Sequence, residues 1–171
     1  FAYDRGSLKA KLCVEGNKMM GDLAKELDFH FIRCGKVLVG NTEEDMETLK
    51  RTMEQGKDNG ATNLELIDEK RLHELVPAVV GKFAMFSHNS GIVDPFGYTI
   101  ALAENAHANG VEYHFGCEVT AIRREDDDTY EITTTKGNFK TRWVVNCAGL
   151  GCGKISDMLG ITGYRIIGSK G

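Results

Sequence analysis

The hydrophobic and polar positions in the first half of the chain follow helical spacing in some stretches and strand-like spacing in others. After Ser7, apolar residues recur every three or four positions, which predicts a helix with Ser7 as its N-cap. Short apolar runs between turn-forming residues predict strands. The predicted helices cover about 7–27, from 41 or 42 to 56–60, and 68–76, and the predicted strands cover 29–33, 36–39, 64–67 and 82–87.

A helix opens the second half of the chain, and a series of short strands follows it. The helix is predicted over about 96–109 and the strands over 111–115, 119–124 and 129–135. Turn-forming residues at Asp126-Asp-Asp128 and Lys136-Gly-Asn138 separate the later strands from one another. Consecutive strands joined by short turns predict an antiparallel meander, which leads into the apolar run at Val144.

Val144 and Val145 belong to a β-branched run that drops abruptly into small residues. The two valines suit a strand buried on both faces, while Gly149, Gly151 and Gly153 allow positive φ and let a phosphate group approach closely. A strand, turn and helix of this kind can bind a dinucleotide. The spacing differs from G-x-G-x-x-G, so a turn that only changes the chain direction stays open as the alternative.

Composition and charge exclude several classes of partner. The chain has 171 residues, 42% of them hydrophobic, which is the size of one domain with enough apolar mass for a core. Its 21 basic and 25 acidic residues give a formal net charge of −4, and no block of lysine or arginine predicts binding to nucleic acid or an anionic membrane. No apolar run reaches the roughly 18 residues that a membrane span needs.

The cysteines of the chain are odd in number and contain no C-x-x-C pair. They are Cys13, Cys34, Cys117, Cys147 and Cys152. This spacing argues against both a disulfide framework and a zinc site. We therefore expect buried free thiols in a reducing cytoplasm and no bound metal. The acidic run 125–128 is expected to be a solvated hairpin tip.

Several strings in the chain resemble those of one known family. They are Gly6-Ser-Leu-Lys-Ala-Lys-Leu-Cys-Val-Glu-Gly16, Cys34-Gly-Lys-Val-Leu-Val39, Ser90-Gly-Ile-Val-Asp-Pro95 and Trp143-Val-Val-Asn-Cys-Ala-Gly149. With the order of elements over 96–160, they resemble the D-amino-acid-oxidase-like (DAO) flavoproteins. Within that family, the resemblance is to the branch of glycerol-3-phosphate dehydrogenases and L-2-hydroxyglutarate oxidases.

The resemblance implies a mixed α+β and α/β fold in two lobes. Residues 1–95 would form a substrate-binding domain in which helices cover a sheet. Residues 96–171 would form the meander and the βα part of a discontinuous, Rossmann-like FAD-binding domain. In the family, the backbone near one strand meets the adenine end of FAD and an Ala-Gly turn meets its phosphate side. The expected FAD contacts are therefore Val119, Cys147, Ala148 and Gly149.

The resemblance also implies FAD-dependent oxidation of a secondary alcohol, with glycerol 3-phosphate as the expected small-molecule substrate. L-2-hydroxyglutarate or another 2-hydroxy acid is the alternative within the family, and a non-catalytic α+β interaction module is the alternative outside it. His88 and Asn89, in the loop between the lobes, are candidates for contact with a substrate over the flavin. Arg33 and Lys36 are candidate donors to its phosphate or carboxylate, although ordinary surface roles stay open for all four.

The chain departs from the family pattern in two places. Where the family has roughly H-A-G-Y-D, this chain has Phe1-Ala-Tyr-Asp4, which offers no histidine to the flavin. The usual A-G-x-x-A-D is Ala148-Gly-Leu-Gly-Cys-Gly153 here.

The family's G-x-G-x-x-G turn and acidic ribose ligand are not found in the 171 residues. We therefore expect a central piece of a longer protein, which by itself holds no FAD, has no dehydrogenase activity and self-associates.

Overall fold

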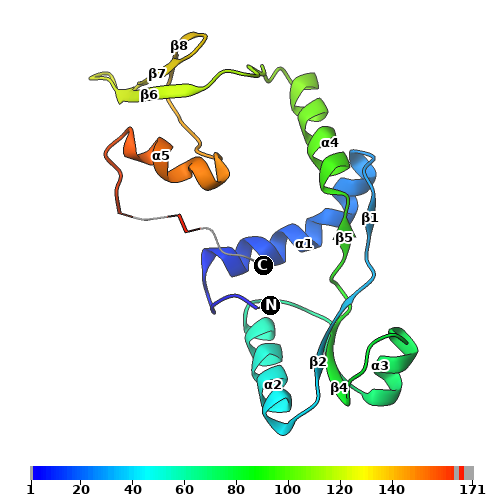
Figure 1. Cartoon of the computed structure of the whole chain (residues 1–171). Helices are drawn as coiled ribbons and strands as arrows, with labels where there is room; N and C mark the ends of the chain where they lie inside the picture. The colour runs from blue at the N-terminus through cyan, green and yellow to red at the C-terminus, as the bar shows by residue number, and fades with distance from the viewer. Residues whose placement is uncertain (1, 164–165, 168–171) are drawn as a thin grey trace. The chain divides into compact units, whose positions relative to one another are not determined.

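The structure, a computed structural model, describes residues 2–163 and 166–167 of the chain. The chain divides into two compact units, Phe1–Val111 and Glu112–Gly171. Figure 1 labels helices α1 to α5 and, where there is room, the strands of both units, all numbered in chain order. Each unit has its own sheets, so each can be understood from its own residues.

A three-stranded antiparallel sheet forms the centre of the first unit. Its strands are β2 (Lys36–Gly40), β3 (Leu64–Asp68) and β4 (Phe83–Ser87). β4 lies in the middle, so the strand order is β2-β4-β3. Val39 lies opposite Ala84, and Ala84 lies opposite Ile67 on the other side. Because side chains alternate along a strand, these three share one face of the sheet.

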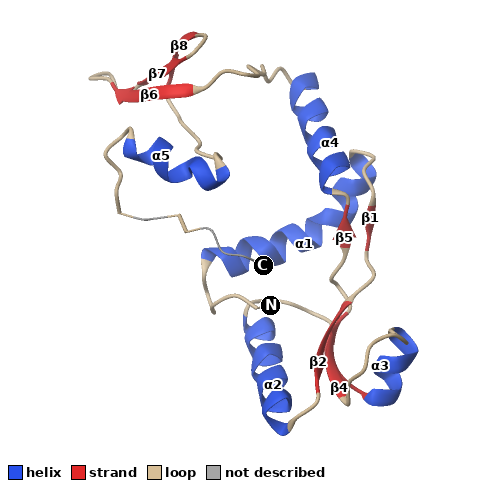
Figure 2. Ribbon diagram, in the orientation of Figure 1, coloured by secondary structure: helices blue, strands red, loops and turns tan. Residues whose placement is uncertain are grey.

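Helices α2 (Glu43–Asp58) and α3 (Glu69–Leu75) flank this sheet, as Figure 2 shows. Thr42 is the N-cap of α2, and its hydroxyl accepts a hydrogen bond from the Asp45 N–H at 3.1 Å. The Asp45 carboxylate accepts in return from the N–H groups of Asn41 and Thr42 at 2.9 and 3.0 Å, which completes a capping box. These donors, Asn41 first, lower the pKa of Asp45 below its ordinary value.

The main core of the first unit lies between α3 and one face of the sheet. Its buried residues are Ile67, Leu72, Ala84 and Phe86, and half-buried Val37, Val39, Leu75 and Val79 pack against them. Asp68 caps α3 by accepting a hydrogen bond from the Arg71 N–H at 2.8 Å. The cap starts the helix one turn before Leu72, which is only 1% exposed.

A second buried cluster joins the remaining elements of the first unit. These are α1 (Leu8–Glu26), β1 (Phe31–Ile32), β5 (Ile92–Val93) and α4 (Pro95–Ala108), with β1 paired antiparallel to β5. Ala24 of α1, Phe29 and Ala101 of α4 are buried together. The ring of Phe29 lies 4.8 Å from that of Tyr98, measured between centroids. By packing, α4 therefore belongs with α1 and not with the meander.

The second unit consists of a meander and a short helix. Its elements are β6 (Val119–Arg124), β7 (Tyr130–Thr134), β8 (Gly137–Thr141), a 3-10 turn (Gly149–Gly151) and α5 (Cys152–Asp157). β7 lies between β6 and β8, and both pairings are antiparallel. Ile122 of β6 is 4% exposed and is the buried apolar residue of the described part of this unit. α5 contacts β6.

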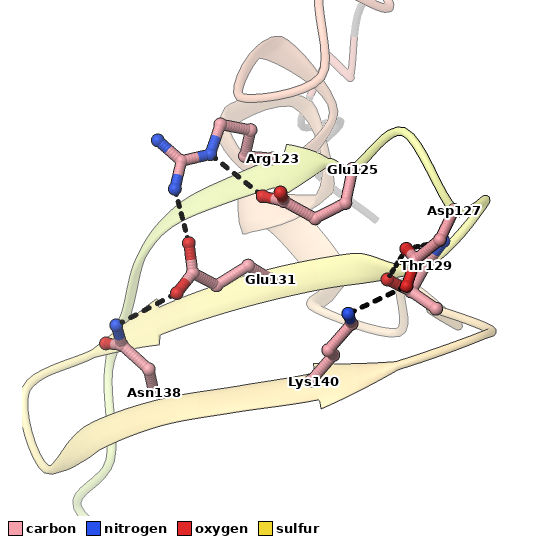
Figure 3. A network of polar contacts seen from close by, with 7 residues as sticks. All are labelled: Arg123, Glu125, Asp127, Thr129, Glu131, Asn138 and Lys140. Atoms are coloured by element: carbon pink, nitrogen blue, oxygen red, sulfur yellow. Dashed lines mark hydrogen bonds and ion pairs between the residues drawn. The ribbon is translucent and has the colours of Figure 1, made fainter.

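Ion pairs run across the exposed face of the meander, as Figure 3 shows. The Arg123 guanidinium contacts the Glu125 carboxylate at 3.0 Å and the Glu131 carboxylate at 2.5 Å. Donation of hydrogen bonds to Glu125 first, and then to Glu131, raises the pKa of Arg123. The Arg123 side chain is 73% exposed, so water screens these pairs and each contributes little to stability.

The acidic hairpin tip is held by the same kind of contact. Asp127 accepts a hydrogen bond from the Lys140 ammonium at 2.8 Å and another from the Thr129 hydroxyl. Lys140 first, and then Thr129, lowers the pKa of Asp127 to about 2. Arg124 pairs with Asp128 at 2.6 Å. Within the run 125–128, the carboxylates of Glu125, Asp127 and Asp128 thus form ion pairs at an exposed tip.

Two strands predicted from the sequence do not form in the described part of the chain. Residues 111–115 and the run containing Val144 and Val145 have extended or irregular backbone without a strand assignment. Val145 is 83% exposed, although its run was expected to be a buried strand. A strand exists only where a neighbouring backbone completes its ladder, and among the described residues none lies beside either run.

The predicted mixed α+β fold is confirmed. The strands at 36–40 and 83–87 lie in a different sheet from the meander, as expected. The functional division of the chain at residue 95 stays a prediction, because the compact units divide after Val111 by packing alone.

The cysteines of the chain are exposed or half-buried. All five cysteines have free thiols, but none is buried, so the prediction of buried thiols is wrong. They lie on a helix surface, in loops and beside the glycine turn, where thiols remain accessible. No helix among the described residues has the length and apolar character to cross a membrane.

Candidate functional site

The turn at 146–151 is organised by the side chain of Asn146. Its amide nitrogen donates to the Cys152 carbonyl at 2.9 Å and to the Ser156 hydroxyl at 3.2 Å. Its amide oxygen accepts from the Ala148 N–H at 3.3 Å. One side chain therefore satisfies backbone groups on both sides of the turn, as asparagine does in Asx turns. Asn146 was not among the predicted site residues, although asparagine before Ala-Gly is the signal that could have identified it.

Gly149 adopts a left-handed backbone conformation. Its φ is +56°, a region that residues with a β-carbon rarely occupy. An added Cβ would meet no atom within 4 Å, so the requirement for glycine comes from the backbone and not from crowding. Cys147, Ala148 and Gly149 are exposed. The turn therefore presents an open strip of backbone with small side chains, the surface that a phosphate-bearing cofactor needs for close approach.

Val119 is the first residue of β6 and lies in the same unit as this turn. It is half-buried and lies opposite Thr134, with a register shift between Val119 and Ala121. The ammonium of Lys154 on α5 contacts the Glu118 carboxylate at 3.5 Å, which links the helix after the turn to the residue before Val119. Both side chains are largely exposed, so this ion pair contributes little to the stability of the unit. Its main effect is to orient α5 relative to Glu118.

A cavity of about 630 Å³ lies between the meander and α5. Ile122, Tyr130, Trp143 and Asn146 are among its lining residues. None of the four residues expected to contact FAD lines it. Asn146 is thus the residue of the turn that also lines the cavity. The cavity and the exposed backbone of the turn are separate features of the unit.

The loop after β4 holds two of the predicted substrate contacts, His88 and Asn89. The His88 Nε2 atom lies 3.0 Å from the Glu65 carboxylate, and the imidazole packs against the Phe86 ring at 4.2 Å between centroids. The Asn89 side-chain amide donates to the Thr62 hydroxyl at 2.9 Å. The two neighbouring side chains therefore have different partners.

Arg33 lies against the same loop, whereas Lys36 begins β2. The Arg33 guanidinium donates to the Asn89 carbonyl at 2.5 Å and to the Asn17 carbonyl at 3.1 Å. Lys36 lies opposite Ser87 in the sheet register. Of the four predicted substrate residues, the structure brings Arg33 and Asn89 into direct contact. Asn17 of α1, which joins them, carried no signal in the sequence because its partners are far away along the chain.

Phe1, which stands where the family pattern has a histidine, lies outside the described residues. In the described ranges, no three His, Cys, Asp or Glu side chains gather closely enough to hold a metal ion.

Comparison with known proteins supplies the family. The family model described as DAO, FAD dependent oxidoreductase, matches residues 1–171. A glycerol 3-phosphate dehydrogenase of Caloramator mitchellensis is 38% identical over 168 residues, covering 97% of this chain and 35% of that protein. A mitochondrial L-2-hydroxyglutarate dehydrogenase of Nematostella vectensis is 30% identical over 171 residues, covering 92% of this chain and 38% of that protein.

Solved structures agree in fold. The solved structure of a dithionite-reduced L-α-glycerophosphate oxidase from Mycoplasma pneumoniae with FAD bound has a TM-score of 0.81 and 22% identity, covering 91% of this chain and 43% of that one. The chain spans 35% and 38% of the length of the two curated relatives. The family model covers every residue of the chain, and the predicted resemblance is confirmed. The chain belongs to the DAO family of FAD-dependent oxidoreductases.

Proposed function

We propose that this chain forms part of a flavin-dependent dehydrogenase that oxidises the secondary alcohol of glycerol 3-phosphate. The observation that carries the proposal is the exposed turn at Gly149, whose positive φ and small neighbours leave backbone accessible to a cofactor. The relative at 38% identity carries the name glycerol 3-phosphate dehydrogenase. FAD, when bound, supplies the hydride acceptor, and the protein supplies binding and orientation.

The residues of the second unit fit the cofactor at the turn. Cys147, Ala148 and Gly149 would face the phosphate side of FAD, since an added Cβ at Gly149 would point into open space. Val119, which starts β6, would face the adenine end. In this proposal residues 96–171 contribute to FAD binding and residues 1–95 contribute to substrate binding.

The first unit would supply the substrate contacts. His88 is 44% exposed and its ring is fixed by Glu65, so it can present a nitrogen to a ligand without losing its position. Asn89 and Arg33 hold each other, and their proposed role is to fix the loop that carries His88. Lys36 would donate to the anionic end of the substrate. We place the reaction in the cytoplasm because the five cysteines are unpaired.

L-2-hydroxyglutarate is the second candidate substrate. A relative named L-2-hydroxyglutarate dehydrogenase is 30% identical and covers 92% of this chain. Glycerol 3-phosphate and L-2-hydroxyglutarate both carry a secondary alcohol and an anionic group, so the same donors could serve either.

Turnover by the full-length protein tests the proposal. The purified protein is supplied with an artificial electron acceptor and either glycerol 3-phosphate or L-2-hydroxyglutarate. We expect bound flavin and faster turnover with glycerol 3-phosphate. Faster turnover with L-2-hydroxyglutarate would instead identify that compound as the substrate. A protein that contains no flavin and reduces the acceptor with neither substrate would be the non-catalytic interaction module.

A further inference from the structure

A small polar cavity lies in the first unit, whereas the residues expected to contact FAD belong to the second unit. Its volume is about 180 Å³, and it is bounded by α1, the turn at 60–62 and the loop at 87–90. The polar side chains that line it include Asn17, Lys18, Thr62, Ser87 and Ser90. Pockets for drug-sized ligands are several hundred Å³, so this one suits a small ligand or a single functional group.

Hydrogen bonds fix the three walls of the cavity to one another. The Asn89 carbonyl accepts from the Arg33 guanidinium at 2.5 Å and from the Asn17 side-chain amide at 3.0 Å, which ties the loop to α1. The Asn89 side-chain amide donates to the Thr62 hydroxyl at 2.9 Å, which ties the loop to the turn. Because these side chains and loops are already fixed, they lose little conformational entropy when a ligand binds.

The lining offers a hydrogen-bond donor that the described contacts do not use. The hydroxyls of Ser87 and Ser90 lie 3.0 Å apart, and either one can donate to the other. Two hydroxyls carry two protons, and their mutual bond uses one of them. When Ser90 donates to Ser87, the other proton lies on Ser87, which is only 4% exposed, so bulk water does not readily take it. A ligand oxygen that accepts a hydrogen bond would satisfy it.

The charge of the lining favours an anion. Lys18 is the charged residue among the lining residues, which include no aspartate or glutamate. Lys18 also borders a neighbouring pocket that contains Glu15 and Asp58, but Asp58 pairs with Arg5 at 2.8 Å. We propose that this cavity binds the carboxylate or phosphate group of a small molecule, with Lys18 and the serine hydroxyls as donors. The proposal does not depend on the proposed dehydrogenase activity.

Cys13 provides the test, because its exposed thiol lines the cavity. The 171-residue chain is alkylated with neutral iodoacetamide in the presence of inorganic phosphate, glutarate or glycerol, and labelling of each cysteine is followed by peptide mass spectrometry. Cys34 is also exposed but does not line the cavity, so it serves as the internal control. Protection by phosphate, by glutarate or by both distinguishes the two anion chemistries.

We expect at least one of the two anions to slow labelling of Cys13 in a saturable manner while Cys34 reacts at an unchanged rate, and we expect no protection from glycerol. In Lys18→Gln the anion concentration for half-protection should rise roughly tenfold, the loss typical of one charge-assisted hydrogen bond. Lys50→Gln on α2 removes the same charge outside the cavity and should behave as the unaltered chain. Equal effects on both cysteines, protection by neither anion, or unchanged protection in Lys18→Gln would overturn the proposal.

Discussion

The side-chain amide of Asn146 donates a hydrogen bond to the Ser156 hydroxyl at 3.2 Å, which connects the residue before the glycine turn to the helix after it. The same amide donates to the Cys152 carbonyl, and Asn146 is half-buried. Because the turn has no regular sheet beside it among the described residues, these bonds hold its two ends together, with the bond from the Gly151 N–H to the Ala148 carbonyl at 2.9 Å.

Asn146→Ala should destabilise the second unit by about 1 to 3 kcal/mol, since it leaves partly buried backbone groups without a partner. Asn138→Ala is the matched control, because Asn138 is exposed and its amide donates to Glu131 at 3.3 Å across the meander surface. The control should change stability by less than about 0.5 kcal/mol. Chemical denaturation of both variants, followed by the fluorescence of Trp143, measures the difference. Equal effects of the two substitutions would argue against the role of Asn146.

Gly149→Val should reduce the flavin content of the full-length protein. A β-branched residue at a φ of +56° is strained by about 1 to 3 kcal/mol, and the turn would relax away from the conformation proposed to meet FAD. Gly153→Val is the control, because Gly153 has no positive φ and an added Cβ meets nothing within 4 Å. Flavin absorbance per protein measures the outcome. Full flavin occupancy in Gly149→Val would show that this turn is not part of the cofactor site.

The ion pair between Asp127 and Lys140 should make the stability of the meander depend on pH. The pKa of Asp127 is lowered from 3.8 to about 2, first by Lys140. A lowered carboxyl pKa contributes stability that is present above about pH 4 and is lost as the pH falls toward about 2. The difference in melting temperature between the unaltered chain and Asp127→Asn should therefore shrink across that window.

Asp126→Asn is the control for this titration, because it removes the same charge one residue away from the ion pair. Its difference in melting temperature from the unaltered chain should change less across the same window. A pH-independent difference for Asp127→Asn would show that the pair with Lys140 contributes no measurable stability in solution.

The 171-residue chain by itself should self-associate and contain no FAD. Trp143 and Val145 are each 83% exposed, and Leu150 is 82% exposed, so the second unit presents apolar side chains to water. Light scattering should give a mass above that of a monomer, and Val145→Lys should shift it toward the monomer. A monomeric mass for the unaltered chain, or stoichiometric flavin absorbance, would contradict this expectation.

Local signals predicted most helices and several strands. Ser7 is the N-cap of α1 as predicted, and the helices expected to start at 41 or 42 and at 68 are capped by Thr42 and Asp68, because capping depends on residues within one turn. The turn at Lys136-Gly-Asn138 was predicted for the same reason, although Gly137 already begins β8. Gly149 was singled out from the pattern, and its positive φ is confirmed.

Contacts between distant segments could not be predicted in this way. Val144 and Val145 have the composition of a buried strand, but a strand also needs a neighbouring backbone, which composition cannot reveal. The pairing of Glu65 with His88 and of Asn17 with Asn89 joins residues far apart in the sequence. The family resemblance, and not a local pattern, assigned four residues to contact with FAD. This assignment stays a prediction for Val119, Cys147, Ala148 and Gly149.

Reduction of the bound flavin tests the central proposal most directly. The full-length protein is mixed anaerobically with glycerol 3-phosphate or L-2-hydroxyglutarate, and the loss of the visible flavin absorbance is followed in time. Our account predicts that glycerol 3-phosphate reduces the flavin at least as fast as the enzyme turns over. It predicts that L-2-hydroxyglutarate reduces the flavin much more slowly. Flavin that neither compound reduces, or a full-length protein that contains no flavin, would contradict it.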